Sequence, residues 1–314
     1  MSRFVAAADV DGHNGDVDLP YLRANPHLLP TFLAHQRLRT TPVGGGSIAV
    51  TERVGLDDGT QLFLKTWPGG VSAAPTDGAP AAAPPGFFTA EAEGLRWLRD
   101  ADGVAVPRVY AASDELLLME WVGHGEPTPA AAERFGRGLA LTHRAGAPAF
   151  GAPADGYFGS LPQDNTPGDD WRTWFRDRRI HPYVKLAVDA GALDPADATA
   201  VESIHIEAPA EPPARIHGDL WPGNVLWGIA DTPWLIDPAS AHGGHRETDL
   251  ATLALFGAAP HLPRILATYN ETHPLAHDWR SRVPLHQLPI LLVHAVLFGR
   301  TYRSAVLDAA AHYR

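Results

Sequence analysis

A short loop sequence in the second half of the chain constrains the fold more than any other feature. Residues 217–224 read HGDLWPGN, which places the carboxylate of Asp219 five residues before the carboxamide of Asn224. Two apolar segments, 225–227 and 234–236, follow and predict a β-hairpin that ends at Asp237. Because a hairpin returns the chain to the side from which it left, we expect Asp237 to lie near the loop.

These three side chains form the set that phosphoryl transfer requires. An Asp orients the attacking hydroxyl and accepts its proton, while Asn and Asp oxygens hold Mg²⁺ against the phosphates of ATP. The spacing Asp-x4-Asn-x12-Asp resembles that of protein kinases. His217-Gly218-Asp219 stands where those enzymes have His-Arg-Asp, and this replacement indicates a kinase that acts on small molecules.

The N-terminal part of the chain carries candidate phosphate contacts. Glycines open a strand-like region that leads to a turn at 57–59, and they could let the backbone approach phosphates closely; the candidate residues are Gly44, Gly45, Gly46 and Ser47. Residues 61–66 predict a second strand, with Lys65 near its end to neutralise phosphate charge. Taken alone, three glycines also fit an ordinary turn.

A helix follows, and it carries a candidate partner for this lysine. Thr89 is predicted to cap it, with Glu91 in its first turn, where Glu91 could pair with Lys65. An acidic residue at this place is also common because the helix dipole favours it. Residues 70–86, rich in Pro and Ala, predict a mobile insert that lengthens the link between Lys65 and Glu91.

The order of elements predicts an α+β, two-lobed protein-kinase-like fold. Residues 1–121 would form an N-terminal ATP-binding lobe with a small antiparallel sheet, whose further strands are expected at 104–110 and 115–121. Residues 122–314 would form a mainly helical catalytic and substrate lobe. Its helices are expected after a cap at Thr128 and at 171–190, 197–206, 248–255, 262–272 and 285–307. The first 40 residues, with helical hints at 28–38, receive no role.

Composition excludes several classes of function. A formal net charge of −11 has the wrong sign for a broad surface that binds nucleic acid or anionic lipid. No cysteine occurs, so disulfides, thiolate metal sites and a cysteine nucleophile are excluded, and the reducing cytosol fits best. Residues 1–10 lack a signal-peptide pattern, and the apolar stretch 288–298 is shorter than the ~20 residues that span a bilayer. We expect a soluble cytoplasmic protein and leave its oligomeric state open.

At family level, the loop sequence resembles the HGDLWxGN signature of the fructosamine kinase (ketosamine 3-kinase) family, relatives of aminoglycoside phosphotransferases with the protein-kinase-like fold. Three more segments are similar: FTAEAEGL at 88–95, GHRETDLA at 244–251 with LFG at 255–257, and LLVHAVLFG at 291–299 with Tyr302. The similarity extends over about residues 20–310.

The resemblance implies roles for individual residues. Asp219 would be the catalytic base, and Asn224 and Asp237 would bind Mg²⁺. The phosphates of ATP would contact Lys65, paired with Glu91. The remaining implied roles are adenine contacts by the backbone of Glu120 and Val122, a sugar pocket lined by Trp221 and His294, and support of the catalytic loop by His217 and Asp249.

The resemblance also implies a reaction. The γ-phosphoryl group of ATP would pass to the 3-hydroxyl of a ketosamine, such as a fructosamine or ribulosamine, free or protein-bound. The unstable 3-phosphate would then release the amine, which amounts to deglycation. Some family members carry a cysteine in the glycine-rich loop, and its absence here removes thiol control at that place.

Several alternatives are compatible with parts of the pattern. They are an aminoglycoside, choline or homoserine kinase, and a nucleotide-binding pseudokinase that regulates a partner. The Leu-Trp after Asp219 argues against the other kinases, and the complete set of carboxylates argues against a pseudokinase. Two further histidines, His242 and His245, invite a zinc site with His217, but neither an HExxH helix nor a thiolate accompanies them.

Two side-chain groups have competing structural readings. Packing is the preferred role of the aromatic residues Trp171, Trp174 and Phe175, against a place at the pocket entrance. For His294, which lies on an apolar helix, a buried structural role competes with the sugar pocket.

Overall fold

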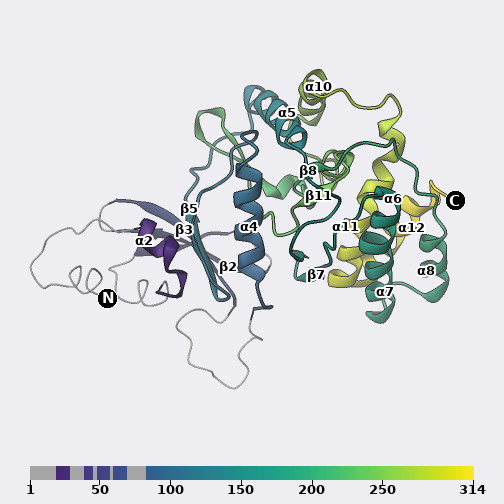
Figure 1. The fold of residues 1–314 in the computed structure, drawn as a ribbon, viewed down its shortest axis with the longest axis horizontal. Helices are drawn as coiled ribbons and strands as arrows, with labels where there is room; N and C mark the ends of the chain where they lie inside the picture. The colour runs from purple at the N-terminus through teal and green to yellow at the C-terminus, as the bar shows by residue number, and fades with distance from the viewer. Residues whose placement is uncertain (1–18, 29–38, 45–47, 57–58, 69–82) are drawn as a thin grey trace, which may run out of the picture. The chain divides into compact units, whose positions relative to one another are not determined.

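The structure is a computed structural model, and it describes residues 19–28, 39–44, 48–56, 59–68 and 83–314 (Figure 1). The predictions for Gly45, Gly46 and Ser47, for most of the insert 70–86 and for most of the first 40 residues lie outside the described residues. The chain divides into two compact units, one formed by 1–89 with 108–122 and one by 90–107 with 123–314.

The first unit is built on a five-stranded antiparallel sheet of order β1-β2-β3-β5-β4. Alternating residues bury one face of this sheet, including Val54, Leu62 and Leu64. Every residue of β1 is exposed, so this strand shows no alternation of apolar and polar residues. For this reason the sequence analysis did not predict it. The strands are β1 Arg39–Pro42, β2 Val50–Gly55, β3 Gln61–Thr66, β4 Val109–Ala112 and β5 Leu116–Glu120, preceded by the helical turns α2 Leu19–Ala24 and η1 Pro26–Leu28.

The helix that carries Glu91 begins earlier than predicted. It is α4, Phe87–Arg99, so Thr89 lies inside it rather than at its cap, and Glu91 lies beyond the first turn. The start is set by a turn, in which the Phe87 N–H donates to the Pro84 carbonyl (3.1 Å). Burial of Phe87 and Phe88, whose rings meet edge to face, draws these residues into the helix.

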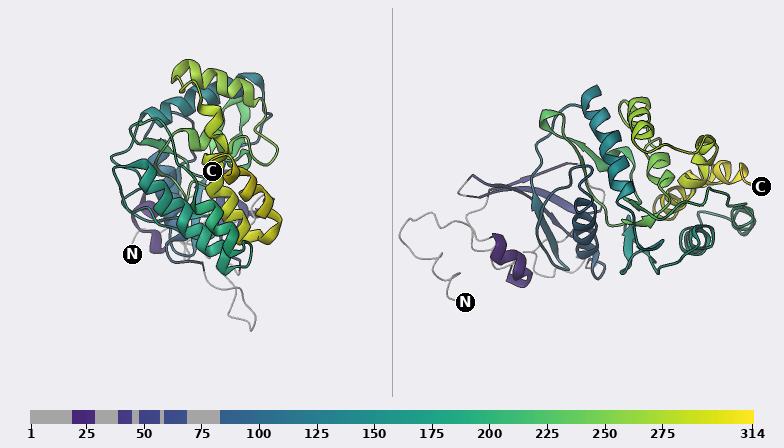
Figure 2. Two further views of the ribbon diagram at one scale, coloured as in Figure 1. Left: turned by 90° about the vertical axis from the view of Figure 1, so that its right-hand side faces the viewer. Right: turned by 45° about the horizontal axis from the view of Figure 1, so that its top comes forward.

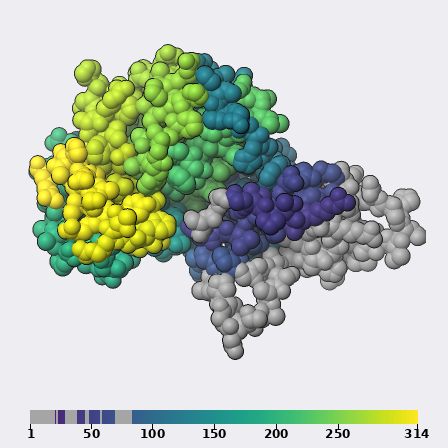
Figure 3. All heavy atoms as spheres, turned by 180° about the vertical axis from the view of Figure 1, so that it is seen from behind, coloured from purple at the N-terminus to yellow at the C-terminus, as the bar shows by residue number. Residues whose placement is uncertain are grey.

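The second unit is mainly helical, as predicted. Its helices are α5 Pro129–Arg144, α6 Trp171–Phe175, the π-helical turn η2 Arg176–Ile180, α7 His181–Asp189, α8 Pro195–Glu202, α9 Glu247–Thr252, α10 Leu262–Thr272, α11 Val283–Phe298 and α12 Arg303–Ala311. Figure 2 shows α5 and α10 packed side by side, and α12 lies on the face shown in Figure 3. The side chains of Trp171, Trp174 and Phe175 are buried in the core, which confirms their packing role.

Several predicted bounds are wrong, for local reasons. The stretch 285–307 is not one helix, because the chain leaves the helical conformation at Gly299 (φ 80°) and forms the turn η6 Gly299–Tyr302 before α12. Instead of 197–206, α8 covers Pro195–Glu202, where a capping box between Asp194 and Asp197 fixes its start. Of the expected strand 104–110, only its end joins β4, and Ala105 makes an isolated bridge to Trp234.

One helical stretch, Trp279–Ala311, is long and apolar enough to cross a membrane, with a mean hydropathy of 1.3. The structure divides it into the turn η5 Trp279–Arg282, α11, η6 and α12. Three leucines of α11, Leu285, Leu288 and Leu292, are fully buried in the core of the second unit. A single stretch of this kind is weak evidence for a membrane span.

Candidate active site

The loop HGDLWPGN connects two small antiparallel ladders. It leaves β8, Ala214–Ile216, which pairs with β11, His242–Gly244. It then forms the turn η3, Pro222–Asn224, and enters β9, Val225–Trp227, which pairs with β10, Pro233–Leu235, across the turn η4, Ile229–Asp231. The predicted hairpin is therefore confirmed, and Asp237 follows it directly.

Gly218 explains why this loop reads His-Gly-Asp. Its φ is 82°, and a Cβ placed on it would lie 2.4 Å from the Ser240 carbonyl oxygen. A side chain here would meet both an unfavourable backbone conformation and a backbone atom that cannot move aside. The glycine thus lets the loop lie against residues 240–242.

Asp249, on α9, holds the loop HGDLWPGN by its backbone. Its two carboxylate oxygens accept the backbone N–H groups of His217 (2.8 Å) and Gly218 (2.9 Å). The side chain is fully buried. Burial alone would raise the pKa of Asp249, but the hydrogen bond from His143 and the nearby histidines hold it below its usual value. An ionised carboxylate therefore fixes the loop backbone.

Two residues that the sequence analysis missed extend this support. His143 of α5 places Nε2 3.2 Å from the Asp249 carboxylate and shares a hydrogen bond through Nδ1 with the Tyr269 hydroxyl of α10 (2.8 Å). Both side chains are buried. His143 and Tyr269 are 126 residues apart, so no local pattern pairs them. The sequence offers one indication only: His143 and Tyr269 each lie on the buried face of their helix.

His217 is a neutral structural residue of the loop. Burial lowers the pKa of His217, and its Nε2 lies 2.8 Å from the Ile236 carbonyl oxygen, which can only accept. The proton is thus on Nε2, and Nδ1 accepts the backbone N–H of Asp219 (3.3 Å). This ring ties the loop to the end of the hairpin that carries Asp237.

Asp219 and Asn224 are brought together as predicted. The Asn224 amide nitrogen donates to the Asp219 backbone carbonyl (2.7 Å), so its Oδ1 is the atom left to bind a cation. Burial, and then the carboxylates of Asp237 and Asp249, raise the pKa of Asp219 well above its usual range. Amide and carboxylate oxygens suit Mg²⁺, so the residues present fit the predicted ion.

Asp237 adopts a left-handed backbone conformation (φ 59°), and α4 packs against the residue that follows it. A Cβ on Gly94 of α4 would lie 2.0 Å from the Pro238 carbonyl oxygen. Only glycine permits this approach, and it accounts for the Gly in the segment FTAEAEGL. Glu91 precedes Gly94 by three residues and so shares its side of the helix.

The first unit contains four of the described residues that were predicted to bind nucleotide. Lys65 is buried in β3, where it lies opposite Thr51 and Leu117. Glu120 ends β5 and exchanges hydrogen bonds with the Arg108 backbone (2.8 and 3.0 Å). Val122 is buried, and Gly44 has open space around its Cα. The nucleotide-binding roles of these residues, and the pairing of Lys65 with Glu91, stay predictions.

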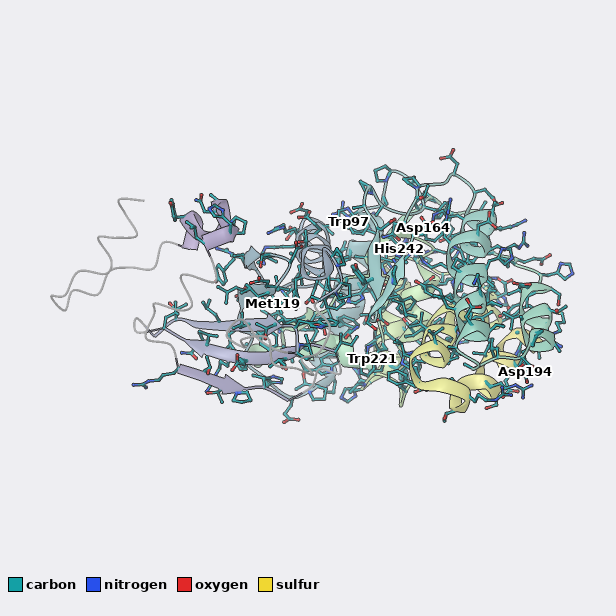
Figure 4. All side chains as sticks on the ribbon, turned by 90° about the horizontal axis from the view of Figure 1, so that it is seen from below. Trp97, Met119, Asp164, Asp194, Trp221 and His242 are labelled. Atoms are coloured by element: carbon teal, nitrogen blue, oxygen red, sulfur yellow. The ribbon has the colours of Figure 1, made fainter. Side chains whose placement is uncertain are left out.

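An aromatic cluster surrounds the predicted sugar-binding residues; its members are Trp221, Phe256, His294, Phe298 and Tyr302. The ring centroid of Phe256 lies 6.1 Å from that of Trp221 and 4.6 Å from that of His294. Tyr302 and Phe298 complete the cluster at 5.1 and 5.3 Å from His294. Figure 4 labels Trp221 next to the C-terminal helices. Trp221 and His294 are therefore joined through Phe256, which the sequence analysis had not assigned.

The histidines considered for zinc have other partners. The His242 ring stacks on Trp174 (5.1 Å) and its Nδ1 donates to the Ser240 carbonyl (2.7 Å). Among the described residues, a possible ligand group consists of His245, Glu247 and His286, all buried.

The chemistry of this group does not suit a metal ion. His245 Nδ1 accepts the Glu247 backbone N–H (3.3 Å), so a neutral ring carries its proton on Nε2 and offers no lone pair there. Burial favours neutral rings, lowering the pKa of His245 to about 3. Both carboxylate oxygens of Glu247 accept hydrogen bonds from Arg282 (2.8 Å each). The group is a buried ion-pair cluster.

The chain is similar to known proteins along most of its length. The fructosamine kinase family model matches residues 31–312. A probable ketoamine kinase of Enterococcus faecium is 32% identical over 290 residues, which cover 88% of this chain and 97% of that protein. A solved structure from Thermobifida fusca, provisionally named a fructosamine-3-kinase, is 49% identical with a TM-score of 0.81 and covers 90% of this chain and 96% of its own.

A more distant structure shows the breadth of the fold. The ethanolamine kinase of Plasmodium vivax is 13% identical, with a TM-score of 0.55 over 87% of this chain and 81% of its own. The two-lobed kinase-like fold predicted from sequence is thus confirmed. From the family match along nearly the whole sequence, the chain belongs to the fructosamine kinase family.

Proposed function

We propose that this protein transfers the γ-phosphoryl group of ATP to the 3-hydroxyl of a ketosamine, either a fructosamine or a ribulosamine. The observation that carries the proposal is the catalytic loop. The buried Asp249 carboxylate fixes its backbone, and Asn224 holds the Asp219 carbonyl. Membership of the family and the name of the Enterococcus faecium relative support a ketoamine as the acceptor.

In the proposed reaction, Asp219 acts as the general base. Its carboxylate accepts the proton of the 3-hydroxyl while that oxygen forms a bond to the γ-phosphorus. The bond from the γ-phosphorus to the bridging oxygen breaks, and ADP leaves with the negative charge. Mg²⁺, held by Asn224 and Asp237, would supply charge neutralisation at the phosphates. Asp249 and His217 keep the base in position.

The remaining predicted residues complete the proposal. Lys65 would contact the α and β phosphates with Glu91 as its partner, and the glycine-rich segment 44–47 would approach the phosphates through its backbone. The backbone of Glu120 and Val122 would contact adenine. In the acceptor pocket, Trp221 would cover the apolar face of the sugar and His294 would bond a hydroxyl.

The product would be a ketosamine 3-phosphate, which eliminates the amine. The role in the cell would be deglycation of small molecules or proteins in the cytoplasm, where ATP is abundant. A domain boundary near residue 121 would then separate nucleotide binding from acceptor binding.

The proposal is tested by measuring ADP release from Mg-ATP with fructosamines, ribulosamines, aminoglycosides and choline. We expect turnover of a ketosamine, with the phosphate located on O3 by ³¹P–¹H NMR. Asp219→Asn should reduce kcat by about 10²- to 10⁴-fold, since it removes a general base. Asp308→Asn is the matched control, because Asp308 is exposed on α12, and it should retain full activity.

Other outcomes would contradict the proposal. Turnover of an aminoglycoside or choline alone would show a different acceptor. Binding of Mg-ATP without any turnover would favour a pseudokinase that regulates a partner. A ketosamine phosphate on a hydroxyl other than O3 would refute the regiochemistry.

A further inference from the structure

The aromatic cluster presents open ring faces rather than a closed core. Phe256 is 41% exposed and Phe298 is 53% exposed, and among the described residues these are the exposed phenylalanines. Single exposed apolar residues are common on proteins, whereas a contiguous group marks a binding surface. The cluster begins two residues after the base, and the backbone N–H of Trp221 donates to the backbone carbonyl of Asp219 (3.1 Å).

Phe256 is held in its place by an unfavourable backbone. Three successive residues after α9 have left-handed φ values, namely Phe256 (52°), Gly257 (105°) and Ala258 (60°). For residues with a Cβ this conformation is uncommon, and proteins retain it mainly where function requires a particular side-chain position. In this protein the left-handed conformation occurs at the residue whose ring lies between Trp221 and His294.

The arginines that flank Tyr302 in the sequence are paired with aspartates, and the histidine of the cluster is neutral. Burial lowers the pKa of His294, and its Nδ1 donates to the Ile290 carbonyl (2.8 Å), so a neutral ring offers the Nε2 lone pair. Arg300 pairs with Asp194 (2.9 Å), and Arg303 pairs with Asp197 (2.7 Å). These three groups therefore do not repel a cation at the rings.

We propose that the aromatic cluster binds the protonated secondary amine of the ketosamine through the ring faces of Trp221 and Phe256. This inference rests on the proposed function and specifies how its acceptor is recognised. In a ketosamine the amine nitrogen is four bonds of about 1.5 Å from O3, and two residues of chain span at most about 7 Å. These two lengths are comparable, so the amine of a substrate whose O3 faces Asp219 can lie at Trp221. Cation–π attraction then favours the charged amine over a neutral substituent.

The test uses two ligands that differ only at the amine position, where one carries a charged N–H donor group and the other a neutral ether oxygen. One is an N-butyl ketosamine in which hydrogen replaces the 3-hydroxyl, and the other is its ether counterpart with oxygen in place of the amine nitrogen. Neither can be phosphorylated at position 3, so calorimetry on the full chain with Mg-ADP measures binding alone. We expect the amine to bind about 5- to 30-fold more tightly than the ether.

Two variants of one residue separate the ring face from mere bulk. Phe256→Leu keeps an apolar side chain but removes the π face, and it should reduce the amine-to-ether ratio of affinities about 3- to 10-fold. Phe256→Tyr is the matched control and should keep the ratio within about twofold. Because the side chain is partly exposed, neither variant is expected to unfold the protein.

The two proposals can fail separately. Equal affinities of the wild type for amine and ether, or an unchanged ratio in Phe256→Leu, would overturn the inference even if O3 phosphorylation is observed. Loss of the ratio in Phe256→Leu would support it even if phosphate transfer fell on another hydroxyl, in which case the proposed regiochemistry alone would fail.

Discussion

At Gly218 a single hydrogen in place of a side chain decides the path of the loop 217–224. The residue combines a left-handed φ with a backbone oxygen, that of Ser240, in the place where a Cβ would lie. The sequence analysis took the glycine as a mark of small-molecule kinases. Its structural reason is the packing of the loop on residues 240–242, which is invisible in the sequence.

We predict that Gly218→Ala destabilises the protein and abolishes most activity. The left-handed conformation costs about 1–2 kcal/mol, and the contact with Ser240 adds to this and displaces Asp219. Gly191→Ala is the control, since Gly191 has φ 70° but open space around it. Urea unfolding measures the stability of both variants, and steady-state kinetics measure their kcat. The control should lose about 1–2 kcal/mol of unfolding free energy and keep a normal kcat. A fully active Gly218→Ala enzyme would contradict this account.

At the residue scale, the candidate site was predictable where its residues are close together in the sequence. Asp219, Asn224 and Asp237 lie within 19 positions on a loop and a hairpin, and the structure joins the first two by a hydrogen bond. Phe256 was not predictable, because its partners Trp221 and His294 come from other elements.

At the scale of elements, the helices α5 and α10 support the loop 217–224, although no residue of that loop belongs to either helix. They pack together, and His143 of α5 connects the Tyr269 hydroxyl of α10 to the Asp249 carboxylate. A change on α10 can therefore affect the loop of the predicted base through the side chains of Tyr269, His143 and Asp249.

We predict that Tyr269→Phe lowers kcat about 3- to 10-fold and leaves KM for the acceptor unchanged. The variant removes the hydroxyl that orients His143, so Asp249 holds the loop less firmly; the lost hydrogen bond also costs about 1 kcal/mol. Tyr313→Phe is the control, since its hydroxyl donates to the Ser281 carbonyl (2.6 Å) far along the chain from the loop residues. It should lose similar stability and keep its kcat. Equal kcat values in both variants would show a merely structural role for Tyr269.

The bounds of elements were harder to predict than their existence. Periodicity found α10 at its observed bounds, 262–272, because its apolar stripe is long and regular. It did not find the break at Gly299, since apolar residues continue on both sides of it. It also did not find β1 or the three-residue strand β11, whose pairing with β8 depends on distant residues.

At the scale of the whole molecule, buried neutral histidines set the response to acid. Burial lowers the pKa values of His242 and His245 to about 3, and it also lowers those of His217 and His286. In the unfolded chain these groups have the ordinary value of 6.5. Between about pH 3 and 6.5 the unfolded chain thus binds more protons than the folded one, so stability falls as the pH falls.

We predict that the free energy of unfolding falls by roughly 3 kcal/mol between pH 6.5 and pH 5 from His242 and His245 alone. Urea titrations at pH 7.5, 6.5, 5.5 and 5.0 measure it. His242→Asn removes one of these titrating groups. It should therefore reduce the slope of the unfolding free energy against pH by up to about 1.4 kcal/mol per pH unit, the contribution of one proton. The exposed His277, changed to Asn, is the control and should leave the slope unchanged. A stability that does not change across this range would refute the account.

The sequence by itself determined the kinase-like fold class, the order of motifs and the loop and hairpin that carry the predicted base and metal ligands. It could do so because these depend on neighbouring residues, on turn chemistry and on periodicity. Only the tertiary structure decided what supports and surrounds the loop. The Asp249 carboxylate meets backbone groups 31 and 32 residues away, and His143 meets Asp249 across 106 residues. Contacts over such separations, and the burial that shifts histidine pKa values, exist only once the chain has folded.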